Sequence, residues 1–570
     1  MSTHMISSRS HVLGAVCCAI ALLPVAAGAQ TRGSRIDRTL RESIEQGCAG
    51  TRSAIITVTP GHREALRHAL AVHGDVVHGE FPAIDAIAAT VHCDDLRALG
   101  GFGSIRGVSA NAVVAASAKG FAREAEGRAA RNLKKIEFAT LGARPAAAAG
   151  GFGIGVAVID SGIEPGPDFG NRITAFYDFT NGNIRAAAPS DDYGHGTHIA
   201  GLIGSEFVGV APYSRLIGLK VLDNRGRGTT ENVVRAVEFA IANRDLLGID
   251  VLNLSLGHPI YEHAATDPLV QAVEHAVREG LAVVVAAGNF GLNPETGEPG
   301  YAGIVSPANA PSAIAVGAVN NFGTVSRVDD RVAPYSSRGP SWYDGFAKPD
   351  VVAPGHDLLS VAARGSALRR LQERRGNKGS YMRLSGTSMA AGVTSAVVAL
   401  LLQANSDMTP NTIKAVLEYT SIPVHGDGPD ELSLLDQGTG QVQVEGALTL
   451  ARLIEPGARL GSGWLTGGFS PSTRIGTATY AWSQSIVWGD RRLAGEALLG
   501  EQRPAWAANI VWGNAFDEDD NIVWGNAFDE DDNIVWGNNT VWGNLLDEDD
   551  NIVWGNNIVW GNRTMRSASR

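Results

Sequence analysis

Five short apolar runs without alternation lie between residues 155 and 319, and amphipathic stretches separate most of them. The runs are residues 155–159, 216–222, 251–256, 282–287 and 313–319. Strands with one solvent-exposed face alternate apolar and polar residues, whereas parallel strands buried on both faces appear as continuous apolar runs. The pattern therefore predicts an α/β domain of three layers, with helices on both faces of a parallel sheet. Functional groups in such sheets collect at the carboxyl ends of the strands.

Ser388 stands at a junction between a tight turn and an apolar, Ala-rich segment, residues 389–405, which has helical length and contains no Pro. We expect Ser388 at the N-terminus of a helix, where free N–H groups and the helix dipole favour negative charge. This position suits a nucleophile whose reaction passes through an oxyanion. On this stretch alone, an ordinary N-cap is the better interpretation. Asp267-Pro268 and Thr409-Pro410 predict two further helix starts.

Three more polar residues occupy the places where such chemistry would need them. Asp160 ends an apolar run, and a carboxylate there can hold an imidazole in one tautomer. His195 begins a small-residue helix between two glycines, and Asn289 ends another run with an amide that can donate to an oxyanion. Each has a plain structural explanation alone. Together with Ser388, the four predict a catalytic Asp160, His195 and Ser388 and an oxyanion donor, Asn289.

The second histidine of this stretch, His198, lies about one helical turn beyond His195. We expect it to be structural. A zinc site on this pair is not favoured, because no third ligand has suitable spacing.

In the order Asp, His, Ser these residues resemble the subtilisin-like serine peptidases over roughly residues 145–455. Other matching stretches are Asn253-Leu254-Ser255-Leu256-Gly257, Gly226-Arg227-Gly228, Tyr335-Ser336-Ser337-Arg338-Gly339-Pro340 and Lys348-Pro349-Asp350. The resemblance implies a subtilisin-like catalytic domain that hydrolyses peptide bonds in peptide or protein substrates. It implies that the substrate contacts Gly226, Gly228, Ser255, Leu256, Gly257, Ala287 and Gly288. No metal ligand and no cofactor are expected. A calcium site is not assumed, because family members with a calcium loop after His198 carry extra residues there, and calcium is left open.

Residues 53–114 are expected to form a small α+β unit. Strands are predicted at residues 54–58, 75–78, 86–92 and 112–114, with helices at 62–72 and from Asp94. Position and pattern make this unit similar to the ferredoxin-like inhibitory propeptide of the same family, here within residues 30–144. Residues 115–138 read as a helical or flexible connector, in which cleavage would release the propeptide.

Residues 1–29 read as a secretory signal peptide, because basic Arg9 precedes an apolar run that ends in Ala27-Gly28-Ala29. The expected location is extracellular or periplasmic, with no membrane span once this segment is removed. In an oxidising compartment Cys48 and Cys93 could pair.

The net charge of −12 belongs to the C-terminal tail. Three runs, residues 517–520, 529–532 and 547–550, hold 12 of the 59 acidic residues, which leaves 47 acids against 47 bases. The rest of the chain therefore has no basic excess of the kind that binds nucleic acid, and no nucleic-acid partner is expected.

The tail, residues 456–570, opens as a Gly/Ser-rich linker and then repeats the motif Asn-Ile-Val-Trp-Gly-Asn. The motif begins at Asn509, Asn521, Asn533, Asn551 and Asn557, with a variant at Asn539 and an earlier relative at residues 486–490. Ile-Val-Trp favours a strand and Gly-Asn a turn. Short stacked strands and a loosely ordered tail are equally good interpretations. Calcium binding by the acidic runs is a minor hypothesis, because they lack the Gly and closing Glu of an EF-hand loop.

The sequence therefore predicts a secreted serine endopeptidase made as an autoprocessed zymogen. The alternative is a secreted binding or surface-display protein, in which the Trp repeats are functional and the peptidase domain is vestigial. All four expected catalytic positions are occupied by suitable residues, and this favours the enzyme.

Overall fold

The structure is a computed structural model of the 570-residue chain. It describes residues 35–116, 119–120, 141, 150–292, 299–374, 379–424, 433–458, 463–487, 489, 535–537 and 553–555. The predicted signal peptide, most of the connector and most of the tail repeats lie outside these residues.

The N-terminal unit is a four-stranded antiparallel sheet with helices, as the sequence predicts. In chain order it contains α1 (Arg38–Glu45), β1 (Thr51–Val58), α2 (Arg63–His73), β2 (Val76–Phe81), η1 (Pro82–Ile84), β3 (Ala86–His92), α3 (Cys93–Leu99) and β4 (Ile105–Ala110). The strand order β2-β3-β1-β4 is the ferredoxin-like arrangement. A disulfide joins Cys48 and Cys93, whose Cα atoms lie 5.8 Å apart.

The strand predicted at residues 112–114 is present but does not belong to this sheet. β4 fills the fourth place beside β1, and β5 (Val113–Ala115) instead pairs with β11 (Arg227–Thr229). The sequence missed β4 because Gly107 and Ser109 interrupt its apolar pattern. It missed α1 because only Leu40 and Ile44, one turn apart, are buried in an otherwise polar helix.

The central sheet has nine strands in the order β15-β14-β13-β12-β7-β10-β8-β9, with β16 also paired to β14. All five apolar runs form strands in it. The strands are β7 (Gly155–Asp160), β8 (Ile173–Asp178), β9 (Arg185–Ala186), β10 (Arg215–Lys220), β12 (Val251–Leu254), β13 (Ala282–Ala286), β14 (Ile314–Asn320), β15 (Arg331–Val332) and β16 (Val351–Pro354). The expectation of a purely parallel sheet is wrong in one respect: the two-residue edge strands β9 and β15 are antiparallel.

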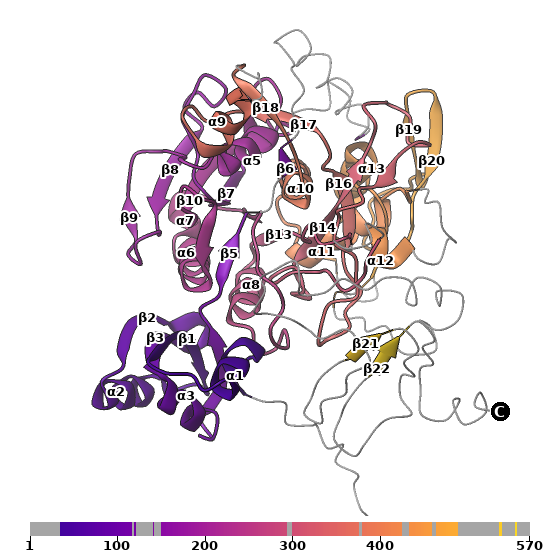
Figure 1. The fold of residues 1–570 in the computed structure, drawn as a ribbon. Helices are drawn as coiled ribbons and strands as arrows, with labels where there is room; N and C mark the ends of the chain where they lie inside the picture. The colour runs from indigo at the N-terminus through magenta and orange to yellow at the C-terminus, as the bar shows by residue number, and fades with distance from the viewer. Residues whose placement is uncertain are drawn as a thin grey trace, which may run out of the picture. The chain divides into compact units, whose positions relative to one another are not determined.

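Helices cover both faces of this sheet (Figure 1), so the three-layer prediction is confirmed. Val156 and Val158 of β7 face one core, and Ala157 and Ile159 face the other. The first core is packed by α5 (His195–Gly204), α10 (Thr387–Ala404), α11 (Pro410–Thr420) and α13 (Val444–Leu453). The second is packed by α6 (Thr230–Ala242) and α8 (Pro268–Arg278).

The helix that follows the Ser388 turn, α10, is the central helix of the first core. Among the helices that the structure describes, it is the one long and apolar enough to cross a membrane, with a mean hydropathy of 1.6 over 18 residues. In this fold 89% of that stretch is buried, which is the behaviour of a core helix. The predicted caps are also present: Asp267 accepts N–H groups at the start of α8, and Thr409 accepts one at the start of α11.

The remaining elements are short. They are β6 (Lys119–Gly120), α7 (Arg244–Leu247), β17 (Leu358–Val361), α9 (Ala367–Arg374), β18 (Tyr381–Ser385), α12 (Ser433–Gln437), β19 (Ser472–Ile475), β20 (Ala478–Ala481), β21 (Val535–Gly537) and β22 (Val553–Gly555). β21 and β22 are two copies of the tail motif, and they pair in parallel with Trp536 opposite Trp554. For these two copies the backbone is strand, as one of the two interpretations of the tail expects.

Candidate active site

The Asp160 and His195 side chains meet where β7 ends and α5 begins. Nδ1 of His195 lies 2.8 and 2.9 Å from the two carboxylate oxygens of Asp160, and both side chains are fully buried. A Cβ at residue 196 would overlap the carbonyl oxygen of Gly162, so Gly196 allows the helix to start directly against the strand end. Nε2 of His195 has no hydrogen-bond partner among the described residues. With Nδ1–H bound to a carboxylate, Nε2 is the nitrogen that can accept a proton.

A second carboxylate, Asp191, shapes the loop that carries His195. It accepts hydrogen bonds from Ser161 Oγ at 2.8 Å, from the Gly194 N–H at 2.7 Å, and from the N–H and Oγ1 of Thr197 at 2.8 and 2.6 Å. Burial raises the pKa of Asp191, and these donors oppose that rise. Sequence analysis missed this residue. An acidic residue four positions before the Gly-flanked His195 was the pattern that could have identified it.

His198 is structural, as predicted. Its Nε2 lies 3.2 Å from the Leu358 carbonyl oxygen and 3.1 Å from that of Met382, so it donates to the backbone of β17 and β18. Burial, with a further contribution from His195, lowers the pKa of His198 to about 3. The ring is therefore neutral at physiological pH and fixes α5 against these strands.

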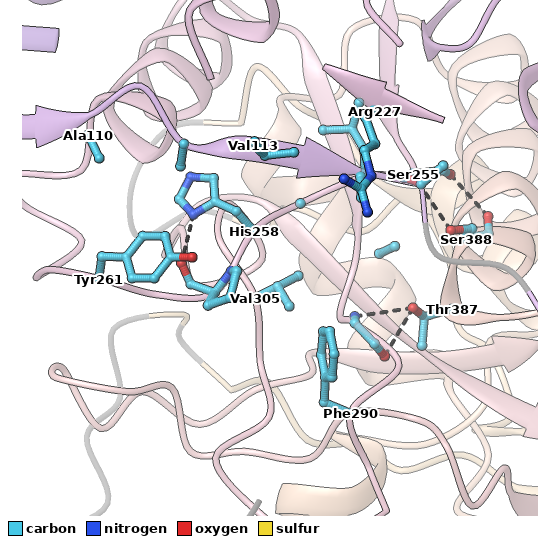
Figure 2. Close-up of a pocket in the computed structure, with 18 of the residues that line it drawn as sticks. Ala110, Val113, Arg227, Ser255, His258, Tyr261, Phe290, Val305, Thr387 and Ser388 are labelled. Carbon is cyan, nitrogen blue, oxygen red and sulfur yellow. Dashed lines mark hydrogen bonds between the residues drawn. The ribbon is translucent and has the colours of Figure 1, made fainter. Parts of the chain in front are cut away.

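Ser388 is the second residue of α10, and the structure brings it to the end of β12 (Figure 2). Its Oγ donates to the Ser255 carbonyl oxygen at 3.1 Å, while Ser255 Oγ donates to the Ser388 carbonyl oxygen, also at 3.1 Å. Since Nε2 of His195 has no hydrogen-bond partner among the described residues, the Ser388 hydroxyl is not bonded to the imidazole in this side-chain orientation. The structure joins Asp160 to His195 and Ser388 to Ser255.

Thr387 ties Asn289 to the start of α10. The Asn289 Oδ1 accepts the Thr387 N–H at 2.9 Å and lies 3.2 Å from Thr387 Oγ1. Thr387 Oγ1 also lies 3.1 Å from both the N and the O of Gly288 (Figure 2). Because the amide oxygen faces the helix, the Asn289 nitrogen is turned away from it. Sequence analysis did not single out Thr387; a Thr directly before a nucleophile at a helix start was the available pattern.

A cavity of about 510 Å³ lies beside Ser388 (Figure 2). Of the predicted substrate contacts, Ser255, Leu256, Gly257 and Gly288 line it. Ala287 does not line it: Ala286 does, while the Ala287 carbonyl accepts the Val305 N–H at 3.1 Å.

The N-terminal unit supplies a strand to this cavity. Val114 of β5 stands opposite Gly228 of β11 in an antiparallel ladder. Ala115 exchanges two backbone hydrogen bonds with Gly257, at 3.1 and 3.3 Å, and Ala116 donates to the Gly226 carbonyl at 3.0 Å. Gly226 and Gly228 therefore lie against an extended chain, which here is the protein's own residues 113–116.

The same chain is paired again on the α10 side of the cavity. There β6 lies antiparallel to β18, with Lys119 opposite Ser385, three residues before Ser388. The two ladders, at Ala115 and at Lys119, are four residues apart and flank Ser388.

A metal-like grouping of side chains is present elsewhere in the described part of the chain. Ligand atoms of Asp75, His92 and Asp95, in the N-terminal unit, lie within 4.8 Å of one another. His92 Nδ1 is already 2.7 Å from Asp75 Oδ1. No such group of described residues includes Asp160, His195 or Ser388.

Known proteins resemble this chain over its central region. Residues 151–445 match the model of the subtilase family of peptidases. Serine protease AprX of Bacillus subtilis is 41% identical over 280 residues, which are 47% of this chain and 61% of AprX. A subtilisin of Bacillus pumilus is 34% identical over 277 residues, which are 48% of this chain and 84% of that protein.

The fold also resembles a solved structure. Fervidolysin from Fervidobacterium pennivorans, a keratinolytic enzyme related to subtilisin, matches with a TM-score of 0.56 at 24% identity, over 70% of this chain and 61% of that one. This likeness concerns the fold alone. The chain spans about three fifths of the length of AprX and of fervidolysin.

Proposed function

The chain belongs to the subtilase family, and from this premise we propose that it is a serine endopeptidase that uses Asp160, His195 and Ser388. The observation that carries the proposal is the buried Asp160–His195 pair, whose Nε2 has no partner among the described residues. In the proposed reaction Ser388 Oγ attacks the scissile carbonyl carbon and His195 takes its proton. The imidazolium then gives that proton to the leaving amine, while Asp160 stabilises the positive ring.

This mechanism requires the Ser388 hydroxyl to leave the Ser255 carbonyl and turn toward Nε2 of His195. Serine side chains occupy three staggered rotamers about one bond, so rotation about that bond can redirect the hydroxyl. A substrate strand paired with residues 255–257 would donate a backbone N–H to the Ser255 carbonyl. The Ser388 hydroxyl would then be free to rotate toward His195.

The oxyanion would be held by the Asn289 side chain and the backbone N–H of Ser388. Ser388 is the second residue of α10, and the helix dipole favours negative charge at this end of the helix. Thr387 supports the Asn289 donor by fixing the oxygen of the same amide.

We expect Asn289→Ala to lower kcat on the order of 10²–10³-fold with little change in KM, because the amide acts on the transition state; the range is that known for oxyanion-hole donors, subtilisin's among them. Steady-state kinetics on a chromogenic peptide would measure it. Asn320→Ala, at the end of β14, is the matched control and should leave kcat unchanged. A raised KM with an unchanged kcat would contradict the oxyanion role.

Peptide or protein substrates would bind as an extended strand between the two glycine-containing edges that β5 now contacts. On this proposal Gly226 and Gly228 form one edge, and Ser255, Leu256 and Gly257 form the other. Main-chain pairing of this kind accepts many sequences, and side-chain pockets add selectivity. Gly288 lines the cavity, whereas Ala287 does not.

We further propose that residues 30–144 are a propeptide that inhibits the same chain, followed by the peptidase domain at 145–455 and the linker and tail at 456–570. The pairing of β5 with β11 supports this, because the same backbone groups cannot bind a substrate and β5 together. Residues 115–116 and 119–120, assigned to a helical or flexible connector by the sequence, pair as extended chain.

Self-cleavage should occur between Ala116 and Lys119. The backbone is paired at Ala115 on one side of Ser388 and at Lys119 on the other, so we expect the cleaved bond to lie between these two ladders. N-terminal sequencing of the first product should therefore begin at Ser117, Ala118 or Lys119. The Ser388→Ala chain, as control, should stay uncut. A first product that starts at any other residue, for example near Gln30, would contradict this.

Secretion to an extracellular or periplasmic location remains a proposal that rests on residues 1–29, which lie outside the described residues. Nucleic-acid binding is not proposed, nor is a membrane span after signal removal; no cofactor is proposed, and calcium stays open. The alternative of a display protein with a vestigial peptidase domain is less well supported, because the Asp160–His195 pair is intact. Fluorophosphonate labelling of the full chain and of a chain ending at Glu455 distinguishes the two.

A further inference from the structure

The first copy of the tail motif begins at Ile486, and its described residues, Ile486, Val487 and Gly489, contact the peptidase domain. Two backbone hydrogen bonds lead the chain to this place: the Ser483 N–H donates to the Ser421 carbonyl at 2.7 Å, and the Gln484 N–H donates to the Tyr419 carbonyl at 3.0 Å. Both acceptors lie at the end of α11. The motif follows directly, and its residues Ile486, Val487 and Gly489 lie beside this helix.

A buried carboxylate receives the second residue of the motif. The Val487 N–H donates to Glu418 Oε2 at 2.8 Å, and the Val487 side chain is 5% exposed, whereas Ile486 is 44% exposed. Glu418 is itself 1% exposed, and its other oxygen, Oε1, has no hydrogen-bond partner among the described residues. Leaving a buried acceptor without a donor is costly, so Glu418 is suited to a bound backbone N–H.

The fourth residue of the motif must be glycine. A Cβ at Gly489 would overlap the Pro311 carbonyl oxygen and lie 2.9 Å from Lys414 Nζ. That ammonium is held in place by the Pro311 and Ala313 carbonyls at 2.8 and 2.9 Å. The motif groove, as we call it, is the surface formed by Pro311, Ser312, Asn411, Lys414, Ala415 and Glu418. A cavity of about 210 Å³ remains between this surface and Ile486, Val487 and Gly489 of the motif.

The same four residues recur in the tail. Ile-Val-Trp-Gly begins again at Ile510, Ile522, Ile534, Ile552 and Ile558, and Thr-Val-Trp-Gly begins at Thr540. Each copy carries the two features that contact the motif groove in the first copy. These are a Val, whose N–H can bond Glu418, and a Gly two residues later, which fits against Pro311. One chain thus offers several copies but one groove of this kind among its described residues.

We propose that the motif groove is a binding site for the Ile-Val-Trp-Gly motif and that tail copies of a second chain occupy it by exchange with residues 486–489. Exchange of an identical element between copies of a chain is a low-cost route to association. The tethered first copy competes at high effective concentration, so exchange is weak per site, and the several copies of each tail raise the avidity. The proposal does not depend on peptide hydrolysis.

Sedimentation velocity of the full chain, in the Ser388→Ala background to prevent self-digestion, tests the second-chain occupant. We expect association that grows with protein concentration and is reversed by excess synthetic peptide Asn-Ile-Val-Trp-Gly-Asn. The matched peptide Asn-Ile-Val-Trp-Ala-Asn should not reverse it. A chain that stays monomeric over the whole concentration range, or association that neither peptide affects, would overturn the proposal; a monomer that still binds the peptide would assign the groove to the chain's own tail.

Groove variants test the site itself. Ala415→Lys fills the groove from the half-buried face of α11 and should abolish association, and Asn411→Lys, at an exposed lining position, should do the same if the first variant folds poorly. Thr449→Lys, an exposed position on α13, is the charge-matched control and should associate normally. Val487→Asp places a second carboxylate beside Glu418 and should expel the first copy, which raises the affinity for fluorescein-labelled peptide about tenfold or more by anisotropy. Unchanged affinity in Val487→Asp, or normal association in both lysine variants, would refute the site.

Discussion

Replacing Ser388 with alanine should abolish both peptide hydrolysis and labelling by a fluorophosphonate probe. The probe reacts with an activated serine hydroxyl, and the proposed mechanism has one such group, next to the start of α10. The expected loss in kcat is on the order of 10⁶-fold, the magnitude known for the nucleophile of subtilisin itself. Intact-mass analysis after incubation with the probe gives the second readout independently of any substrate.

The control for this variant lies on the same helix. Ser395 is two turns further along α10, where its Oγ donates to Asn253 Oδ1 at 2.9 Å. Ser395→Ala leaves that buried acceptor unpaired and should lower stability by about 1–3 kcal/mol, yet the probe should still label the protein. Retained turnover in Ser388→Ala would mean that another residue is the nucleophile.

Asp160→Asn is expected to give the second-largest loss, about 10⁴-fold in kcat. An amide in place of the carboxylate can donate a hydrogen to Nδ1 of His195, which stabilises the tautomer with its proton on Nε2. That nitrogen could then no longer accept the Ser388 proton. The amide would also fail to stabilise the imidazolium that forms during the reaction. Steady-state kinetics measures the loss, and circular dichroism checks that the variant is folded.

A neighbouring carboxylate provides the control for the charge. Asp192 stands close to the His195 loop, but its side chain is 65% exposed and lies 3.5 Å from Lys220. Such exposed pairs contribute little, so Asp192→Asn should keep nearly full activity. Equal losses in Asp160→Asn and Asp192→Asn would indicate a general effect of charge and would contradict the positioning role of Asp160.

The two flanking ladders also explain how one chain can be both substrate and inhibitor. The pairing at Ala115 uses the backbone edge that a substrate would need, and the pairing at Lys119 holds the chain beyond Ser388. A cut between them leaves the ladder at Ala115 intact. On this proposal the cleaved N-terminal unit would stay bound until it dissociates or is degraded.

The sequence alone determined the features that depend on residues close together in the chain. Unbroken apolar runs such as the one before Asp160 gave strands because both faces of the sheet are covered. Pro after a cap residue gave helix starts at Asp267 and Thr409 because Pro fits the first turn and lacks an N–H. The residue types and chain order of Asp160, His195 and Ser388 identified the family.

Only the tertiary structure decided features that join distant residues. β5 pairs with β11 and not with the N-terminal sheet. The backbone edge of β11 is its partner, and no pattern within residues 112–114 encodes that choice. The tertiary structure gave Asp191 five hydrogen bonds around the His195 loop. It also turned the Ser388 hydroxyl to Ser255, 133 residues away in the chain, in place of His195. Sequence periodicity fixes which face of a strand or helix is buried, whereas the choice among hydrogen-bond partners depends on sheet order and side-chain rotamers, which are settled when the elements pack.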